Sequence, residues 1–243
     1  MRLYIALIVF IPFLVSAQKT KKVVIEDYDL FARHEYYVLK KDKSIKHGVF
    51  KSTWVNGNPR LEGYYKNGKK DSLWTYFHQY KPIVCSRGYY EEDKKIGVWE
   101  YFDSKGKIMN RYDHSTHQLS YTTFVDTVKT YELRINDSTF EAKPQQPPIF
   151  LEGETVKNRV IQENISYPQE AITNNIFGTV HVSFFVNNEG QATDHQIIKS
   201  IGGGCDEEAL RVVMLIPDEW APAIYNGTVV ESKVIVLITF VLN

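Results

Sequence analysis

The chain has 243 residues, enough for one large domain or two modest ones, each with its own core. Hydrophobic residues make up 43% and charged residues 24%, which is ordinary for a globular protein. Lys+Arg and Asp+Glu balance at 29 each, so no net field favours nucleic acid or an anionic membrane as the partner.

The first 17 residues have the layout of a secretory signal peptide. Arg2 precedes the apolar run Leu3–Val15, and Val15-Ser16-Ala17 supplies the small residues expected before cleavage, here ahead of Gln18. A retained membrane anchor is the alternative, but spanning the hydrocarbon takes about 20 apolar residues. We therefore predict a signal peptide at 1–17 and an exported mature chain.

Residues 18–142 are predicted to be an all-β region because they carry an internal repeat. The segment 63–77, G-Y-Y-K-N-G-K-K-D-S-L-W-T-Y-F, returns 25 residues later at 88–102, and a degenerate copy includes Gly48 and Phe50. Asn67-Gly68 favours a tight turn between two strand-forming runs. Each copy is therefore predicted to be a β-hairpin whose Trp and Tyr rings stack on the next copy.

This pattern resembles MORN-type repeats, as found in bacterial antitoxin-repeat proteins. The resemblance covers roughly residues 46–112 and implies an elongated, twisted β-sheet used for structure or for protein contacts. An aromatic ladder that binds glycans is the alternative role of the rings, and ladder packing is the one we favour.

The stretch that follows the repeats gives weaker signals. Residues 125–133 and 138–140 are predicted to be strands that continue the repeat sheet. His114 and His117 beside Asp113 have no third ligand of clear geometry, so polar surface is predicted here and no metal site. Residues 143–149 are predicted to be a short extended linker because their prolines lack amide hydrogens.

Residues 150–243 are predicted to form a two-layer domain with a three-stranded antiparallel sheet and two or more helices. The elements expected are a helix at 154–164, a helical turn from Pro168 to Ile172, strands at 178–186, 192–201 and 228–241, and a helix at 207–216. The first strand alternates strictly, with one face of Val180, Val182, Phe184 and Val186 turned to the core.

Within that domain, Asp206 is predicted to cap the helix at 207–216. The buried stripe of this helix is predicted to be Ala209, Leu210, Val213 and Met214. Cys85 and Cys205 fall in different predicted domains and in no metal-binding spacing, so we expect two separate small hydrophobic residues.

The last third of the chain resembles the C-terminal domain of the TonB energy transducers. The resemblance is carried over about 90 residues by Tyr167-Pro168, Ala171, Gly178, the alternating strand to Val186, Gly190, Lys199-Ser200, Cys205-Asp206, Ala209-Leu210, Pro217, Trp220, Asn226-Gly227 and Phe240. It implies a periplasmic domain of a Gram-negative bacterium that grips short peptide segments of outer-membrane transporters by strand addition.

The resemblance therefore implies an exported periplasmic protein that supports transmembrane transport by binding outer-membrane transporters or other envelope proteins. The partner-binding edge would be the last strand, with Val230, Ser232, Val234, Val236, Ile238 and Phe240. A neighbouring loop or a second copy in a homodimer would also cover such an edge.

Two alternatives stay open. One is a membrane-anchored energy transducer with an uncleaved N-terminus, which alone would require inner-membrane motor proteins. The other is an envelope scaffold that uses the aromatic repeats. The sequence predicts no enzyme and no cofactor, because no nucleophile elbow or zinc motif accompanies its seven histidines.

Overall fold

The computed structural model describes residues 18–127, 130–136 and 138–242. The predicted signal peptide, residues 1–17, lies outside the described residues. In the described part, no helix combines the length and the apolar character needed to cross a membrane.

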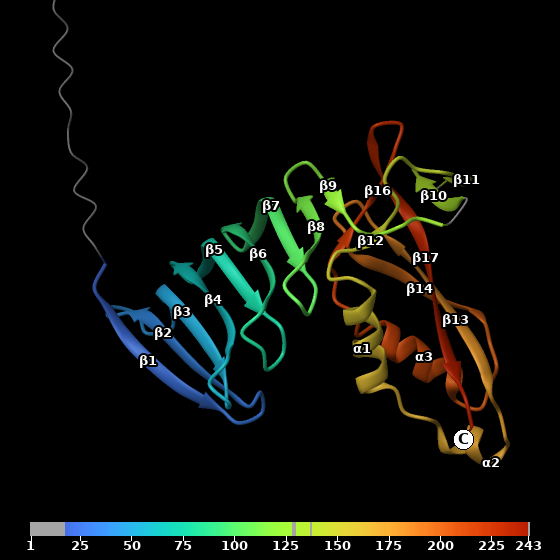
Figure 1. The fold of residues 1–243 in the computed structure, drawn as a ribbon, viewed down its shortest axis with the longest axis horizontal. Coiled ribbons are helices and arrows are strands. Elements are labelled where there is room, and N and C mark those ends of the chain that lie inside the picture. Colours follow the sequence, from blue (N-terminus) through green and yellow to red (C-terminus); the bar gives the residue numbers. More distant parts are fainter. Residues whose placement is uncertain (1–17, 128–129, 137, 243) are drawn as a thin grey trace, which may run out of the picture.

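The N-terminal region is a nine-stranded antiparallel sheet whose strands lie side by side in sequence order, which confirms the predicted all-β region (Figure 1). Each strand hydrogen-bonds only to its neighbours in the chain, so the sheet grows as a row of hairpins. The strands are β1 (Thr20–Asp27), β2 (Ala32–Leu39), β3 (Lys46–Trp54), β4 (Pro59–Lys66), β5 (Lys69–Phe77), β6 (Val84–Glu91), β7 (Lys94–Phe102), β8 (Ile108–Asp113) and β9 (Gln118–Thr122).

Each repeat is built around a tryptophan seated on a glycine of the preceding strand. A Cβ atom added to Gly63 would lie 2.2 Å from the Trp74 ring, and one added to Gly88 would lie 2.3 Å from the Trp99 ring. Both indoles are fully buried. Trp74 Nε1 donates to the Tyr64 carbonyl at 3.1 Å, and the same bond recurs one repeat later from Trp99. The repeated glycine is thus a packing requirement.

The turn and the ring stacking predicted for the repeat are also confirmed. Asn67 and Gly68 have φ angles of 52° and 90° between β4 and β5, the left-handed backbone of a tight hairpin turn. Tyr65 packs edge-to-face on Trp74 with centroids 5.1 Å apart, and Tyr90 packs on Trp99 at the same distance. One sheet face is therefore a continuous aromatic ladder.

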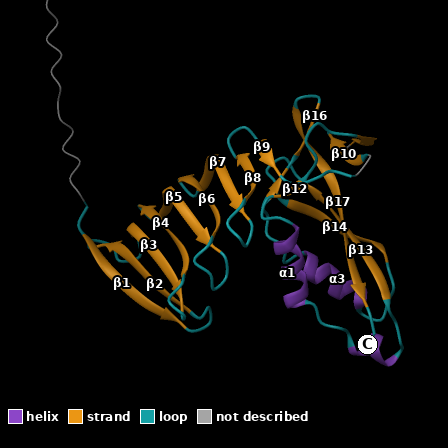
Figure 2. Ribbon diagram, in the orientation of Figure 1, coloured by secondary structure: helices purple, strands orange, loops and turns teal. Residues whose placement is uncertain are grey.

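The C-terminal region combines a second antiparallel sheet with the helices of the chain (Figure 2). The sheet has the strand order β11-β10-β17-β13-β14, and β16 pairs with the first residues of β17, Thr228 to Val230. Its elements are β10 (Tyr131–Ile135), β11 (Ser138–Ala142), β12 (Ile149–Phe150), α1 (Glu154–Asn164), α2 (Gln169–Thr173), β13 (Gly178–Val186), β14 (Ala192–Lys199), α3 (Cys205–Val213), β15 (Trp220–Ala221), β16 (Ala223–Tyr225) and β17 (Thr228–Phe240).

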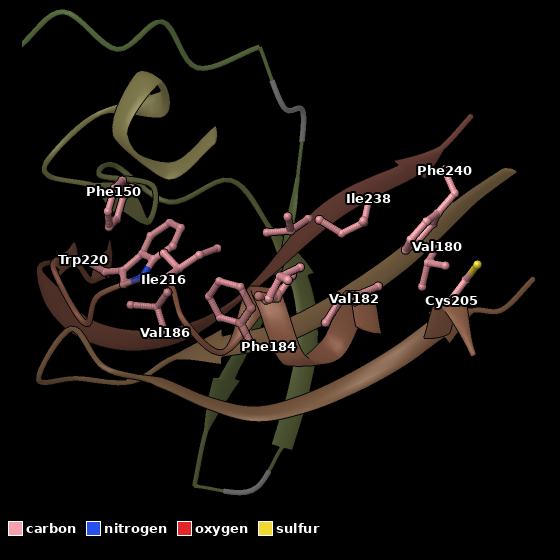
Figure 3. Packing of buried hydrophobic residues seen from close by; sticks show 14 of the residues in the cluster. Phe150, Val180, Val182, Phe184, Val186, Cys205, Ile216, Trp220, Ile238 and Phe240 are labelled. Atoms are coloured by element: carbon pink, nitrogen blue, oxygen red, sulfur yellow. The ribbon is translucent and has the colours of Figure 1, made fainter. Parts of the chain in front are cut away.

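The core of this region lies between the sheet and α3, with the inward side of β13 at its centre (Figure 3). Val180, Val182, Phe184 and Val186 are all buried, as their alternation predicts. Trp220 closes one end, with its ring 5.3 Å from Phe184 and 5.1 Å from Phe150. The free thiol of Cys205 is buried in the same core, while Cys85 lies in β6 and is also unpaired.

Helix α3 differs in two details from its prediction. Its N-cap residue is Gly204, and the Asp206 carboxylate instead accepts hydrogen bonds from the Ser200 hydroxyl and from the amides of Ile201 and Gly202. The Asp206 side chain therefore stabilises the loop that precedes the helix. Val212 is buried because the inward stripe of the helix runs through Cys205, Ala209, Val212 and Val213, and Met214, beyond the last helical residue, is 61% exposed.

The strands predicted to continue the repeat sheet belong instead to the C-terminal sheet. Strand β10 pairs with β11 and, at Leu133 and Arg134, with β17. The C-terminal sheet is consequently wider than the three strands expected. The prediction was wrong because β propensity identifies a strand but carries no information about which sheet edge it joins.

The two regions are in direct contact. Ile149, Leu151 and Ala221 are buried in the cluster that contains Trp99 and Tyr101, and Asn110 Nδ2 donates to the Leu151 carbonyl at 2.8 Å. The segment 143–149 runs between the regions, and its Gln146 side chain donates to the Pro222 and His117 carbonyls. The division into a β-repeat region at 18–142 and a separate domain at 150–243 stays a prediction.

Replacing Gly63 with alanine is expected to lower the free energy of unfolding by about 1–3 kcal/mol, because the new methyl group overpacks the Trp74 site. Chemical denaturation followed by tryptophan fluorescence measures the change. Glu62→Ala, on an exposed position of the same strand, is the matched control and should stay within about 0.5 kcal/mol. Equal effects of the two substitutions would contradict the packing role of Gly63.

Burial between the regions, together with the nearby Glu219 carboxylate, raises the pKa of Glu152 from its ordinary value near 4.5 to about 7. Between these values the unfolded chain has lost a proton that the folded chain still holds, so the free energy of unfolding should fall as pH rises from 4.5 to 7. Thermal unfolding across this range, compared with Glu152→Gln, measures the effect. The variant should show a flatter pH dependence, and an unchanged slope would contradict the assignment.

Candidate functional site

The last strand, β17, is the longest of the C-terminal sheet and is fixed on one side by β13. The pairing runs without a break from Gly178 opposite Phe240 to Val186 opposite Ser232. Every residue of β13 therefore has a partner on β17, and this ladder sets the direction of each β17 side chain.

The other side of β17 is only partly covered. Near its start, Glu231 and Ser232 pair with β10. Strand β16 pairs with Thr228 to Val230, ahead of the point where the β13 ladder begins. From Lys233 to Phe240 the structure pairs no further described strand with this side. The edge expected along the whole strand is thus wrong for Ser232, which lies between Leu133 of β10 and Val186 of β13. Val230 pairs with Ala223 of β16. Val234, Val236, Ile238 and Phe240 lie on the uncovered part. We call Lys233–Phe240 the open edge.

Side chains of the open edge alternate between the core and the surface. Val236, Ile238 and Phe240 are buried against the helix layer. Ile235 and Leu237 are 52% and 58% exposed on the opposite face. The side chains available for contact with a partner are therefore Ile235 and Leu237, which were not named from the sequence.

A cavity of about 370 Å³ adjoins the start of the open edge. Strand β10, the loop before it, β12 and the first turn of α1 enclose it together with β17. Its lining is Phe124, Thr130, Tyr131, Glu132, Glu141, Pro148, Ile149, Phe150, Glu154, Lys157, Trp220, Lys233, Val234 and Ile235. The buried Trp220 indole nitrogen has no hydrogen-bond partner among the described residues. A mainly apolar hollow thus lies where a segment added to β17 would start or end.

Ion pairs hold β10 against β17 and mark the limit of the open edge. Lys233 Nζ lies 2.6 Å from Glu132 Oε2, and Arg134 pairs with Glu231 and with Asp194 of β14 at 2.5 and 2.7 Å. The Arg134 guanidinium also lies 4.1 Å from the Phe185 ring centroid. It therefore buries Phe185, a residue on the face of β13 that alternation alone predicts to be open to solvent.

The histidines near Asp113 are bound to tyrosines. His114 Nε2 lies 2.9 Å from the Tyr101 hydroxyl, and His117 Nδ1 lies 2.9 Å from the Tyr112 hydroxyl. Burial, together with the charge of Lys95, lowers the pKa of His114 to about 3, so it is neutral at physiological pH. Within the described ranges, no three His, Cys, Asp or Glu residues converge as a metal site would require.

Comparison with protein families identifies the C-terminal region. Residues 163–242 match the family described as the Gram-negative bacterial TonB protein C-terminal. This stretch is a TonB C-terminal domain. It begins at the end of α1 and contains β13, β14, α3 and β17, so the open edge lies entirely inside it.

The TonB C-terminal family is non-catalytic, belongs to the Gram-negative cell envelope, and typically binds TonB-dependent outer-membrane transporters. The domain accordingly suggests a TonB-like role in energising such transporters. No curated protein and no solved structure matches the chain. The likeness of the N-terminal sheet to MORN-type repeats stays a prediction.

Hydrogen exchange should distinguish the two parts of β17. Glu231 pairs with β10 and Ser232 pairs with both β10 and β13, whereas alternate amides from Lys233 to Phe240 point away from β13 and lack a partner among the described strands. We expect those alternate amides to exchange roughly a hundredfold faster than the amides of Glu231 and Ser232. Residue-resolved exchange by NMR measures this, and uniform protection along β17 would contradict an open edge.

Proposed function

We propose that this protein binds an extended peptide segment of an outer-membrane transporter, or of another envelope protein, by adding it as a strand to the open edge. The observation that carries the proposal is a TonB C-terminal domain whose last strand has one side paired with β13 and the other uncovered from Lys233 onward. Unpaired amides and carbonyls of an exposed edge are a ready template for another chain.

The surroundings of the edge favour a partner with alternating side chains. Successive residues of an added strand point to opposite faces. Those on the inner face would meet the cavity bounded by Phe150, Trp220 and Val234. Those on the outer face would lie beside Ile235 and Leu237, whose exposed apolar surface the partner would cover. Main-chain bonds would supply affinity, and the cavity would select for apolar residues.

Strand β14, which with β11 is a terminal strand of the same sheet, serves as an internal comparison. Strand β14 pairs only with β13 and ends the sheet on its far side. Its pairing with β13 is interrupted by two register irregularities, unlike the unbroken ladder between β13 and β17. Since bulges and irregular edges discourage strand addition, we assign the partner to β17.

A membrane-anchored energy transducer is the second candidate, favoured by the apolar run Leu3–Val15 in the sequence. The two candidates share the binding edge and differ in whether the chain is tethered at the inner membrane. Mass spectrometry of the mature N-terminus combined with membrane fractionation separates them. A soluble chain that begins at Gln18 supports the exported form, and a membrane-bound chain that retains Met1 or Arg2 supports the anchored one.

Site-directed cross-linking tests the position of the partner. In a Cys85→Ser background, Leu237→Cys places a thiol beside the open edge, and Ile198→Cys places a matched exposed thiol on β14. A cysteine-bearing peptide from the periplasmic N-terminal segment of a transporter should form a disulfide with Leu237→Cys about tenfold faster or more, because strand addition raises the local thiol concentration.

The outcomes of this experiment separate the possibilities. Equal rates at both thiols would contradict the assignment to β17. Disulfide-linked dimers of Leu237→Cys that exclude the peptide would show that a second copy occupies the edge. Both variants should match the parent in thermal unfolding, because residues 198 and 237 are exposed and their substitution leaves the core intact.

A further inference from the structure

Three lysines recur on the aromatic face of the N-terminal sheet, each held above a group of rings. The Lys46 ammonium lies 5.1–5.4 Å from the centroids of Tyr36, Phe50 and Tyr65. The Lys70 ammonium lies 4.8–5.5 Å from Trp74, Tyr76 and Tyr90, and that of Lys95 lies 4.2 and 5.7 Å from Trp99 and Tyr101. We call each lysine with its rings a lysine cage.

The cages follow the sequence repeat. Lys46, Lys70 and Lys95 stand at the starts of β3, β5 and β7, so neighbouring cages are two strands apart. With strands about 4.8 Å apart, this places successive ammonium groups about 10 Å from one another. Burial lowers the pKa of Lys70, and the positive charges of Lys95 and Lys46 lower it further. The three ammonium groups are therefore close enough to repel one another.

The third cage is already occupied by a carboxylate of the same chain. Glu219, in the loop before β15, lies with both carboxylate oxygens 2.6 Å from Lys95 Nζ. The Tyr101 hydroxyl donates to the same carboxylate at 3.2 Å. The side chains of Lys95 and Glu219 are only 15% and 24% exposed. The molecule thus contains one filled example of what a lysine cage accepts.

In the other two cages the same cation has no carboxylate within ion-pair distance among the described residues. The Asp93 carboxylate, which accepts a hydrogen bond from the Lys70 amide at 2.7 Å, acts on the Lys70 ammonium only through its charge. Lys70 Nζ donates to the Tyr76 hydroxyl at 2.9 Å, and Tyr76 stands where the filled cage has Tyr101. Within the described residues, neither Lys70 nor Lys46 forms an ion pair. A partly desolvated ammonium gains charge-assisted hydrogen bonds when an acid approaches, and the nearby aromatic walls exclude competing water.

We propose that the Lys46 and Lys70 cages bind an acidic, extended segment of a partner protein, one glutamate to each cage. This interaction is separate from the strand addition proposed for β17. The occupied third cage gives the chemistry, a side-chain carboxylate delivered by a polypeptide. The cage spacing gives the pattern, because three residues of a segment in the extended polyproline II conformation rise about 9 Å and return the side chain to the same side. The matching motif is Glu-x-x-Glu.

The test uses the whole purified protein and the peptide acetyl-Ser-Gly-Glu-Ser-Gly-Glu-Ser-Gly-amide. Calorimetry at low ionic strength measures binding, and tryptophan fluorescence reports contact with the cage of Trp74. The same peptide with glutamine in place of both glutamates is the ligand control. Lys70→Met and Lys46→Met remove the charge while keeping an unbranched apolar stem over the rings.

Lys51→Met is the matched protein control. Lys51 is the neighbour of Phe50 on β3, so it projects from the opposite face, where it lines a cavity of about 810 Å³. The Lys51→Met substitution removes one positive charge, as the other two substitutions do, and it does so from the strand that carries Lys46. We expect Lys70→Met or Lys46→Met to weaken binding of the glutamate peptide about tenfold or more, and Lys51→Met to change it less than about twofold.

Several results would overturn the proposal. These are no binding of the glutamate peptide to the parent protein, equal binding of the glutamine peptide, or an equal loss with Lys51→Met. Binding of phosphatidylglycerol vesicles without binding of the peptide would assign the face to a membrane surface. Lysine-dependent self-association without peptide binding would assign it to a second copy. Thermal unfolding of each variant confirms that a loss of binding is not a loss of fold.

Discussion

The unbroken antiparallel ladder between β13 and β17 is the constraint on which the C-terminal region depends. It joins residues 178–186 to residues 232–240 and so fixes which side chains of both strands enter the core. Because side chains alternate, a slip of one residue would move Val236 and Ile238 to the surface. The same ladder uses one edge of β17 from Ser232 to Phe240 and leaves the other to β10, which covers only its first part.

The N-terminal sheet follows a different principle, since each hairpin is stabilised by the one beside it. The Trp74 ring fills the space above Gly63, and the Trp99 ring repeats the arrangement over Gly88. The two regions then meet through the last such unit, where Glu219 pairs with Lys95 and Leu151 packs among the rings. The contact between regions is therefore an extension of the repeat: the C-terminal part supplies a carboxylate that the earlier units lack.

Prediction from sequence was most accurate where a pattern is local. The limits of α1 and β13 and the turn at Asn67-Gly68 follow from neighbours within a few residues. It was least accurate for segments without such a pattern. The strands at 131–135 and 138–142 were recognisable as β structure, yet their membership of the C-terminal sheet depends on Leu133 reaching Ser232, about a hundred residues away in the chain.

The amino-acid sequence by itself determined that the chain has two regions, that the first is a β-repeat and that the second is a small α+β module with a long final strand. Periodicity and turn residues carry this information because they act through adjacent backbone. Only the tertiary structure decided that Ser232 lies between β10 and β13 while the edge after it is open. It also decided that Lys95 has a carboxylate ion-pair partner, whereas among the described residues Lys46 and Lys70 have none. Those facts depend on which distant segments touch, and that is set by the packing of the two cores together.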